Sequence, residues 1–172
     1  MKIYHGTKAT FQTFDTNFAG TGEAGDIPAI WFTDNYKGAY NHALKTRQAG
    51  VPKVFECTLD ESTIILNTRI PIVEQPIVYE NILKYFPVII STNINSNTKS
   101  NDLFSSYFDI NNKFGHRYIR DTSTLLNKYL KLANIHAIYD YEQEWTDLYL
   151  HGPTTVVFDI QKINIIKIHY LS

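Results

Sequence analysis

The sequence predicts an α+β domain built from two packed β-sheets. Short apolar runs of strand length outnumber the helical patterns, one helix follows an early strand, and strands dominate after residue 135. The chain has 172 residues, of which 44% are hydrophobic. A chain of this length buries a core without metal or disulfide staples. We therefore expect residues 1–172 to form a single domain.

The first strand is expected at residues 2–5 and leads into His5, Gly6 and Thr7. Ile3 and His5 fall on the same face because successive side chains of a strand alternate. Gly6 has no Cβ, so the flat face of a ligand can approach its backbone closely. Taken alone, His5 is more typical of a structural histidine at a strand end than of a binding residue.

The second block is a strand followed by a helix. The strand consists of three apolar residues, Ile30, Trp31 and Phe32. Thr33 and Asp34 come next, and both residue types are good helix N-caps. The helix expected over about residues 35–48 carries three side chains with rings, Tyr36, Tyr40 and His42. The ends of the first two strands therefore predict an aromatic cleft.

The remaining elements are predicted from apolar patterns and chain breakers. Strands are expected at 53–59, 64–66, 136–141, 148–150, 154–160 and 164–171. One helix is expected over 77–86, with Ile82, Leu83 and Phe86 inward and Pro87 ending it. A second helix begins near Asp121 and has an apolar face of Leu125, Leu126, Tyr129, Leu130 and Ala133. The polar run 91–102 is interpreted as a flexible surface loop.

Two further segments allow more than one interpretation. Residues 17–28 contain Gly20, Gly22 and Gly25, which is typical of a mobile surface loop and equally of a lid over a dinucleotide. Residues 113–120 combine basic and aromatic side chains. That combination suits single-stranded nucleic acid, although an ordinary solvated face has the same composition.

Three blocks in order along the chain resemble the His-Tyr-Glu class of NAD-dependent ADP-ribosyltransferases. This class includes diphtheria toxin and the poly-ADP-ribose polymerases, and the resemblance is to its small bacterial and phage members. The blocks are His5-Gly6-Thr7, Phe32-Thr33-Asp34-Asn35 with the aromatic helix, and residues 154–163. The resemblance implies an ADP-ribosyltransferase-like fold, with two mainly antiparallel sheets around a central cleft and flanking helices. It also implies NAD as a substrate.

The resemblance assigns roles to the first block. In this class the histidine hydrogen-bonds the adenosine-side ribose, and the backbone of the following glycine holds the nicotinamide carboxamide. These roles would fall to His5 and Gly6, with Thr7 in the same NAD-binding block. An uncharged donor and acceptor for a sugar, beside a bare backbone for an amide, is chemically suited to this ligand.

Two aromatic residues eleven positions apart grip nicotinamide in this class. Without a gap, these positions are Trp31 and His42. If the helix is shifted, Tyr40 or Tyr36 takes the second position, and Phe32 belongs to the same NAD-binding block. Stacking between flat rings contributes about 0.5–1.5 kcal/mol per aromatic pair beyond burial. Trp31 is also compatible with plain core packing.

The third block departs from the class, because the position of its catalytic glutamate is Thr154. A carboxylate stabilises the positive ribose that forms as nicotinamide leaves, whereas a hydroxyl offers only a dipole. Thr154 therefore argues against chain elongation. It leaves single-unit transfer, substrate-assisted catalysis or no catalysis. Glu144, in a Glu-x-Glu pair with Glu142, is a candidate substitute, and the same pair is typical of a solvated loop.

Composition narrows the other function classes. The net charge is −1, so no global field attracts nucleic acid. The single cysteine, Cys57, lies in an expected strand and is interpreted as a buried apolar residue, consistent with a reducing compartment. The histidines show no metal-ligand spacing. With no apolar leader and no run near the roughly 18 residues of a membrane span, we expect a cytoplasmic protein without membrane contact.

The resemblance implies a mono-ADP-ribosyltransferase that modifies a macromolecule, either a protein or a nucleic acid. The habits of the class suggest a toxin-like or phage-defence role, with an antitoxin or immunity protein as a partner. The alternative is a non-catalytic module that keeps the fold and binds NAD, ADP-ribose or a partner. A third interpretation, an NAD-dependent RNA 2′-phosphotransferase, lacks its set of arginines here.

Overall fold

The computed structural model describes residues 1–15, 29–100, 102, 127–141 and 152–172. The strands are β1 (Lys2–Thr7), β2 (Ile30–Thr33), β3 (Lys53–Leu59), β4 (Ile65–Asn67), β5 (Ala137–Tyr139), β6 (Thr154–Val157) and β7 (Ile163–Tyr170). The helices are α1 (Tyr36–Lys45), α2 (Pro76–Tyr85) and α3 (Val88–Ser91), with 3-10 turns at Ile72–Glu74 and Ile160–Lys162. Residues 127–132 are also helical. The α+β class is confirmed.

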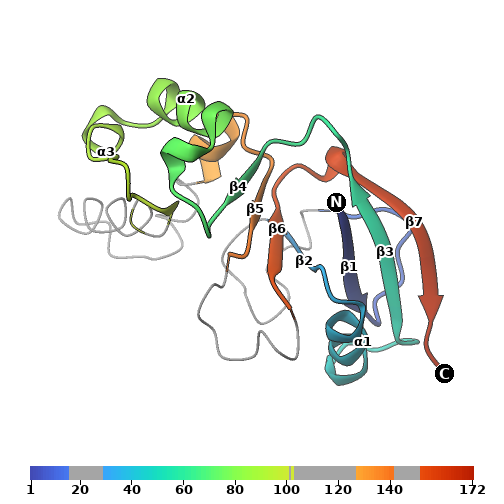
Figure 1. Cartoon of the computed structure of the whole chain (residues 1–172). Helices are drawn as coiled ribbons and strands as arrows, with labels where there is room; N and C mark the ends of the chain where they lie inside the picture. Colours follow the sequence, from blue (N-terminus) through green and yellow to red (C-terminus); the bar gives the residue numbers. More distant parts are fainter. Residues whose placement is uncertain (16–28, 101, 103–126, 142–151) are drawn as a thin grey trace, which may run out of the picture.

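The described strands form one seven-stranded sheet in the order β4-β5-β6-β2-β1-β3-β7 (Figure 1). The predicted division into two packed sheets is not seen, because β2 pairs on both of its sides. It pairs with β6 along its whole length but with β1 only where Tyr4 faces Thr33. The sheet thus has a β1 wing (β1, β3 and β7) and a β6 wing (β6, β5 and β4), joined through β2.

All strand pairs except β4 with β5 are antiparallel. Each wing buries apolar side chains against a helix. Ala39 and Ala43 of α1 pack on Val54 of β3 in the β1 wing. In the β6 wing, strand residues pack against α2, α3 and the helical residues 127–132; this core includes Leu66, Ile138, Val156, Val78, Ile82, Ile90 and Leu130.

A third cluster covers the other face of the sheet and is rich in phenylalanine. It consists of Ile3, Phe14, Ile30, Phe32, Phe55, Cys57, Leu59, Ala137 and Val157. The buried position of Cys57 is confirmed, and burial together with the neighbouring Glu56 charge raises the pKa of its thiol to about 12. The thiol therefore stays protonated at neutral pH, as expected for an inert core residue.

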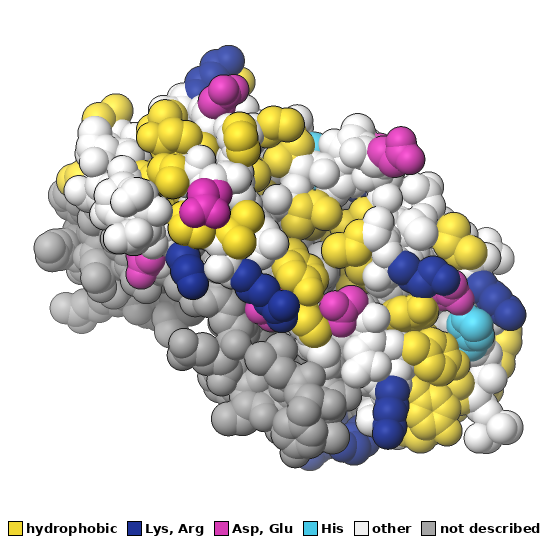
Figure 2. Space-filling view, in the orientation of Figure 1, with side chains coloured by type: hydrophobic (Ala, Val, Ile, Leu, Met, Phe, Trp, Pro, Cys, Tyr) yellow, Lys and Arg dark blue, Asp and Glu magenta, His cyan; other side chains and the backbone are white. Residues whose placement is uncertain are grey.

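The helix predictions hold in outline and fail in detail. The N-cap of α1 is Asn35, whose side chain accepts from the Lys37 N–H, and not Thr33 or Asp34. Leu83 was expected to face inward but is 46% exposed. The run after Pro87 forms α3, on which Val88 and Ile89 are 74% and 55% exposed. Figure 2 shows hydrophobic side chains on the surface over α2 and α3.

The polar run 91–102 is more ordered than its composition indicates. Thr98 Oγ1 accepts from the Asn95 N–H, and the Ile72 N–H donates to the Thr98 carbonyl, both at 2.9 Å. Thr98 and Ser100 are buried. The strand expected at 148–150, the glycine-rich loop 17–28 and the basic stretch 113–120 lie outside the described residues. No helix in the described part of the chain is long and apolar enough to cross a membrane.

Candidate functional site

The candidate site begins where β1 and β2 stop pairing. After the Tyr4–Thr33 pair no further backbone register joins the two strands. His5, the next residue of β1, bridges the separation with its side chain, since His5 Nδ1 lies 2.8 Å from the Trp31 carbonyl oxygen. The imidazole is thereby fixed at the junction of the two wings.

The surroundings of His5 determine its protonation state. Four phenylalanine rings surround the imidazole with centroids 5.4–6.5 Å away: Phe11, Phe14, Phe32 and Phe55. Burial lowers the pKa of His5 to about 4; the hydrogen bond to Trp31 opposes this shift and the nearby His42 charge adds to it. His5 is therefore neutral at pH 7. Its side chain lies on the same face of β1 as that of Ile3, as predicted.

Neutrality fixes the tautomer. A carbonyl oxygen only accepts, so His5 Nδ1 must carry the proton that is donated to Trp31. The other ring nitrogen, Nε2, is then an acceptor with a lone pair. The site consequently offers an uncharged acceptor, which suits a hydroxyl group of a ligand.

The two residues after His5 have structural tasks. A Cβ on Gly6 would lie 1.9 Å from the Ala39 carbonyl oxygen, so the missing side chain makes room for α1. The room that the sequence predicts for a ligand is thus occupied by α1, and the role of the Gly6 backbone toward nicotinamide stays a prediction. Thr7 is buried and its hydroxyl donates to Gln48 Oε1 at 2.6 Å, which anchors the segment after α1.

The rings on α1 are divided between two directions. Tyr36 packs edge-to-face on Tyr4 at 5.5 Å and on His169 of β7 at 5.3 Å. Tyr40 packs with Ala39, Ala43 and Val54 in the same cluster. His42 is exposed and is close enough to His5 for its charge to lower the His5 pKa. Of the three candidates, His42 is the one whose charge affects the pKa of His5.

Trp31 and Phe32 lie on opposite faces of β2. Phe32 packs in the phenylalanine cluster, with its ring centroid 5.7 Å from that of His5. The Trp31 ring packs instead against the core of the β6 wing and edge-to-face on Tyr141 at 5.5 Å. The structure therefore brings His5 together with Phe32 and with the Trp31 carbonyl, but not with the Trp31 ring.

The third block lies on the other side of β2. Thr154 faces Thr33 across the β2–β6 pair, and its carbonyl accepts from the Tyr141 N–H at 3.0 Å. Thr155 faces Phe32 and is fully buried. Thr154 is thus at the β2 end next to the junction. Glu144, the candidate substitute carboxylate, lies outside the described residues.

A charged cluster at the same ends of β2 and β5 was missed by sequence reasoning. Asp34 Oδ2 accepts from the Tyr139 hydroxyl at 3.3 Å. Arg69 Nε donates to Asp140 Oδ2 at 2.6 Å, and its guanidinium lies 5.3 Å from the Tyr139 ring centre. Asp140 has a positive φ of 56°. Asp34 and Tyr139 are 105 positions apart, so no local pattern could have paired them.

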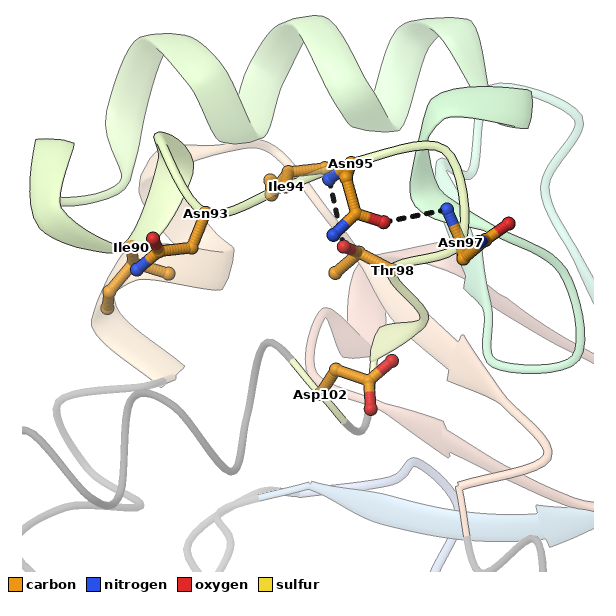
Figure 3. A pocket seen from close by; sticks show the side chains of 7 residues that line it. All are labelled: Ile90, Asn93, Ile94, Asn95, Asn97, Thr98 and Asp102. Atoms are coloured by element: carbon orange, nitrogen blue, oxygen red, sulfur yellow. Dashed lines mark hydrogen bonds between the residues drawn. The ribbon is translucent and has the colours of Figure 1, made fainter.

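A separate hollow of about 260 Å³ lies near α3. Figure 3 shows its lining: Ile90, Asn93, Ile94, Asn95, Asn97, Thr98 and Asp102. The Asn95 side chain is already used, because its Oδ1 accepts from the Asn97 N–H at 2.9 Å. None of the lining residues belongs to the three blocks. In the part of the chain that the structure describes, no group of His, Cys, Asp and Glu could hold a metal ion.

The α+β fold, the His-Gly-Thr strand and the capped aromatic helix are the features on which the resemblance to ADP-ribosyltransferases rests. Comparison with protein families agrees: residues 1–81 match the model of a family described as ADP-ribosyltransferase in polyvalent proteins. The resemblance to ADP-ribosyltransferases is thus confirmed over that stretch, which runs from β1 into α2. Comparisons with curated proteins and with solved structures found no match.

Proposed function

We propose that this protein is a mono-ADP-ribosyltransferase of the His-Tyr-Glu class, which cleaves NAD and transfers ADP-ribose to a macromolecule. The observation that carries the proposal is His5, neutral and tethered to the Trp31 carbonyl where the two wings separate. It lies in the stretch that matches the ADP-ribosyltransferase family. Its Nε2 accepts from a ribose hydroxyl, and the Gly6 backbone is offered to the carboxamide of nicotinamide.

The second nicotinamide contact is assigned to His42 in place of Tyr40. Tyr40 is occupied with Ala39, Ala43 and Val54, whereas His42 interacts electrostatically with His5. Phe32 supports the His5 ring from within the core. Trp31 contributes its carbonyl to the orientation of His5, and its ring contributes to core packing.

The proposed reaction is a displacement at ribose C1′. The bond from C1′ to the nicotinamide nitrogen breaks, and its electron pair leaves with nicotinamide. A nucleophile of the acceptor forms the new bond to C1′, and its proton passes to solvent. Thr154 in place of a glutamate favours transfer of one unit over chain growth.

The acceptor is a protein side chain or a nucleic-acid base. The habits of the class support a toxin-like role in the cytoplasm, with an antitoxin or immunity protein as a partner. Part of the argument for nucleic acid is the basic and aromatic stretch 113–120, which lies outside the described residues.

The test uses NAD labelled either in nicotinamide or in the adenylate. Purified protein and cell lysate should release labelled nicotinamide and retain adenylate label on a macromolecule. Loss of that label on protease treatment identifies a protein acceptor, and loss on nuclease treatment identifies a nucleic acid. Absence of nicotinamide release, beside an active control transferase, contradicts the proposal.

The second candidate function is a module that binds NAD or ADP-ribose without turnover. Two observations favour it: Thr154 stands where the class has a carboxylate, and the Trp31 ring packs in the core of the β6 wing. This module would protect its fold against thermal unfolding when NAD or ADP-ribose is added, because a ligand that binds only the folded state stabilises it. It would release no nicotinamide.

A further inference from the structure

We propose that Asp34 supplies the carboxylate that the third block lacks, and that it contacts the nicotinamide-side ribose. This proposal rests on the proposed function. A transferase of this kind needs negative charge beside C1′, where positive charge develops as nicotinamide leaves. Thr154 provides a hydroxyl dipole in that position, so another side chain must provide the charge.

Asp34 lies beside Thr154. It follows β2 directly, and its N–H donates to the Pro153 carbonyl at 3.4 Å. Thr33, the preceding residue, is the registered partner of Thr154. The backbone of Asp34 is therefore the continuation of β2 along the start of β6.

The carboxylate of Asp34 is directed across the start of β6. Its Oδ2 accepts from the hydroxyl of Tyr139, which belongs to β5 on the far side of β6. Its Oδ1 would lie 2.9 Å from a Cβ built on Gly152. A side chain that starts after β2 and is bonded to β5 crosses the end of β6, so the carboxylate lies beside the first residues of that strand.

Capping of α1 does not require Asp34. Thr33 Oγ1 accepts from the Asn35 N–H at 3.1 Å, and Asn35 Oδ1 accepts from the Lys37 N–H at 3.0 Å. Asp34 is exposed, so a ligand can reach its carboxylate. Among the described residues, its side-chain hydrogen-bond partner is the neutral phenol of Tyr139, and no described cation forms a direct ion pair with it.

Two buried polar atoms near Asp34 have no hydrogen-bond partner in the part of the chain that the structure describes. They are Asp140 Oδ1 and Thr155 Oγ1. Thr155 is the registered partner of Tyr139. Arg69 is paired with Asp140 and also interacts electrostatically with Asp34. This end of the sheet therefore combines an accessible carboxylate with polar groups that find no partner among the described residues.

In the reaction, Asp34 forms no covalent bond. The C1′–nitrogen bond breaks with its electron pair on nicotinamide, the carboxylate stabilises the positive ribose, and the acceptor nucleophile then bonds to C1′. The proton of the nucleophile goes to solvent. The Tyr139 hydroxyl orients the carboxylate and is a positioning residue.

The test compares kcat and KM for nicotinamide release in wild type and in Asp34→Asn, which is nearly isosteric. We expect kcat to fall about a hundredfold, with KM for NAD changed by no more than about threefold. Asp34→Asn combined with Thr154→Glu should regain at least about tenfold of the lost kcat, because it returns a carboxylate to this place. Combination with Thr154→Gln, which adds the same length without charge, should regain nothing.

Tyr139→Phe provides a second measurement that leaves Asp34 unchanged. Loss of one orienting hydrogen bond should lower kcat by about five- to tenfold. Asp60→Asn is the matched control, since Asp60 is exposed in the turn after β3 and its carboxylate accepts from the nearby Ser62 N–H. Its kcat should stay within about twofold of wild type.

The outcomes separate the two proposals. If wild type releases nicotinamide and Asp34→Asn does so with unchanged kcat, the role of Asp34 is overturned and the transferase function stands. The role of Asp34 is also overturned if Thr154→Glu and Thr154→Gln restore the lost kcat of Asp34→Asn equally, because the charge then makes no difference. If wild type releases no nicotinamide, the proposed function fails and the role of Asp34 fails with it.

Discussion

The polar groups on the two sides of β2, next to β1 and next to β6, lie in opposite environments. On the β1 side, phenylalanine rings surround His5 and keep it uncharged, with a fixed tautomer. On the β6 side, Asp34, Arg69 and Asp140 form a charged cluster around Tyr139. The uncharged hydrogen-bonding group therefore lies in the β1 wing, and the charged groups lie on the side of the β6 wing. A ligand across β2 would meet a neutral acceptor on one side and a carboxylate on the other.

The largest effect that probes the β1 side should come from Gly6→Ala. A Cβ at this position would lie 1.9 Å from the Ala39 carbonyl oxygen and 2.9 Å from the Ala43 nitrogen. Both atoms are backbone and cannot rotate away, so α1 must shift from β1. We expect the free energy of unfolding to fall by about 3 kcal/mol. Urea unfolding measures this change. A free energy of unfolding equal to that of wild type, within experimental error, would contradict the close packing of α1 on β1.

The neutral state of His5 predicts a pH dependence of stability. The pKa of His5 is lowered to about 4 in the folded chain from an ordinary 6.5. As the pH falls from 6.5 to 4, the unfolded chain therefore binds the proton first and the native state loses stability. Each pKa unit corresponds to about 1.4 kcal/mol, and partial exposure of the ring reduces the total loss to about 2 kcal/mol.

The measurement compares urea unfolding of wild type and His5→Gln at about pH 7, 5.5 and 4.5. Glutamine cannot titrate, so the advantage of wild type over the variant should shrink as the pH falls. His136, whose pKa burial also lowers, contributes equally to both proteins. Parallel pH dependences would contradict the lowered pKa of His5.

On the β6 side, Arg69→Ala should destabilise the protein by removing the partner of a buried carboxylate. The Arg69 side chain is 50% exposed and that of Asp140 is 5% exposed. Because Arg69 is half in solvent, we expect a loss of about 1–2 kcal/mol, below that of a fully buried pair. Lys2→Ala is the control: it breaks an ion pair with Glu56 on the β1 wing in which Lys2 is exposed. Lys2→Ala should change the free energy of unfolding little. Equal losses in Arg69→Ala and Lys2→Ala would contradict the difference between the two wings.

The smallest expected effect decides whether His42 or Tyr40 contacts nicotinamide. His42→Ala should raise KM for NAD by about three- to tenfold, the equivalent of one stacking contact, without loss of stability. Tyr40→Ala should lower the free energy of unfolding, because Tyr40 packs with Ala39, Ala43 and Val54, and should leave KM unchanged. The reverse pattern would move the nicotinamide contact to Tyr40.

Local patterns predicted the elements well. The strand leading to His5, the helix after Asn35 and the strands at 154–157 and 163–170 follow from alternation, capping residues and breakers, which act over a few positions. The His5 and Ile3 face was also predicted. Leu83 was placed wrongly because α2 buries only a narrow stripe, Val78 and Ile82, and leaves its flank exposed.

The pairing of strands that are distant in sequence could not be predicted from the sequence. The single sheet depends on β2 pairing with both β1 and β6, and strand partners distant in sequence leave no local pattern. The opposite orientation of the Trp31 and Phe32 rings depends on which face of β2 meets the phenylalanine cluster. Likewise, Arg69 and Asp140 are 71 positions apart. Sequence therefore predicted the residues near the site, but not how they are divided between the wings.

The central claim is that a neutral His5 at the junction of β1 and β2 binds NAD for transfer. The most direct measurement is kcat/KM for nicotinamide release by His5→Ala and by His169→Ala. His169 is the matched control, a β7 histidine that is bonded to Glu56. We expect His5→Ala to lose about a hundredfold or more and His169→Ala to stay within about threefold of wild type. Wild-type kcat/KM in a folded His5→Ala variant would contradict the account.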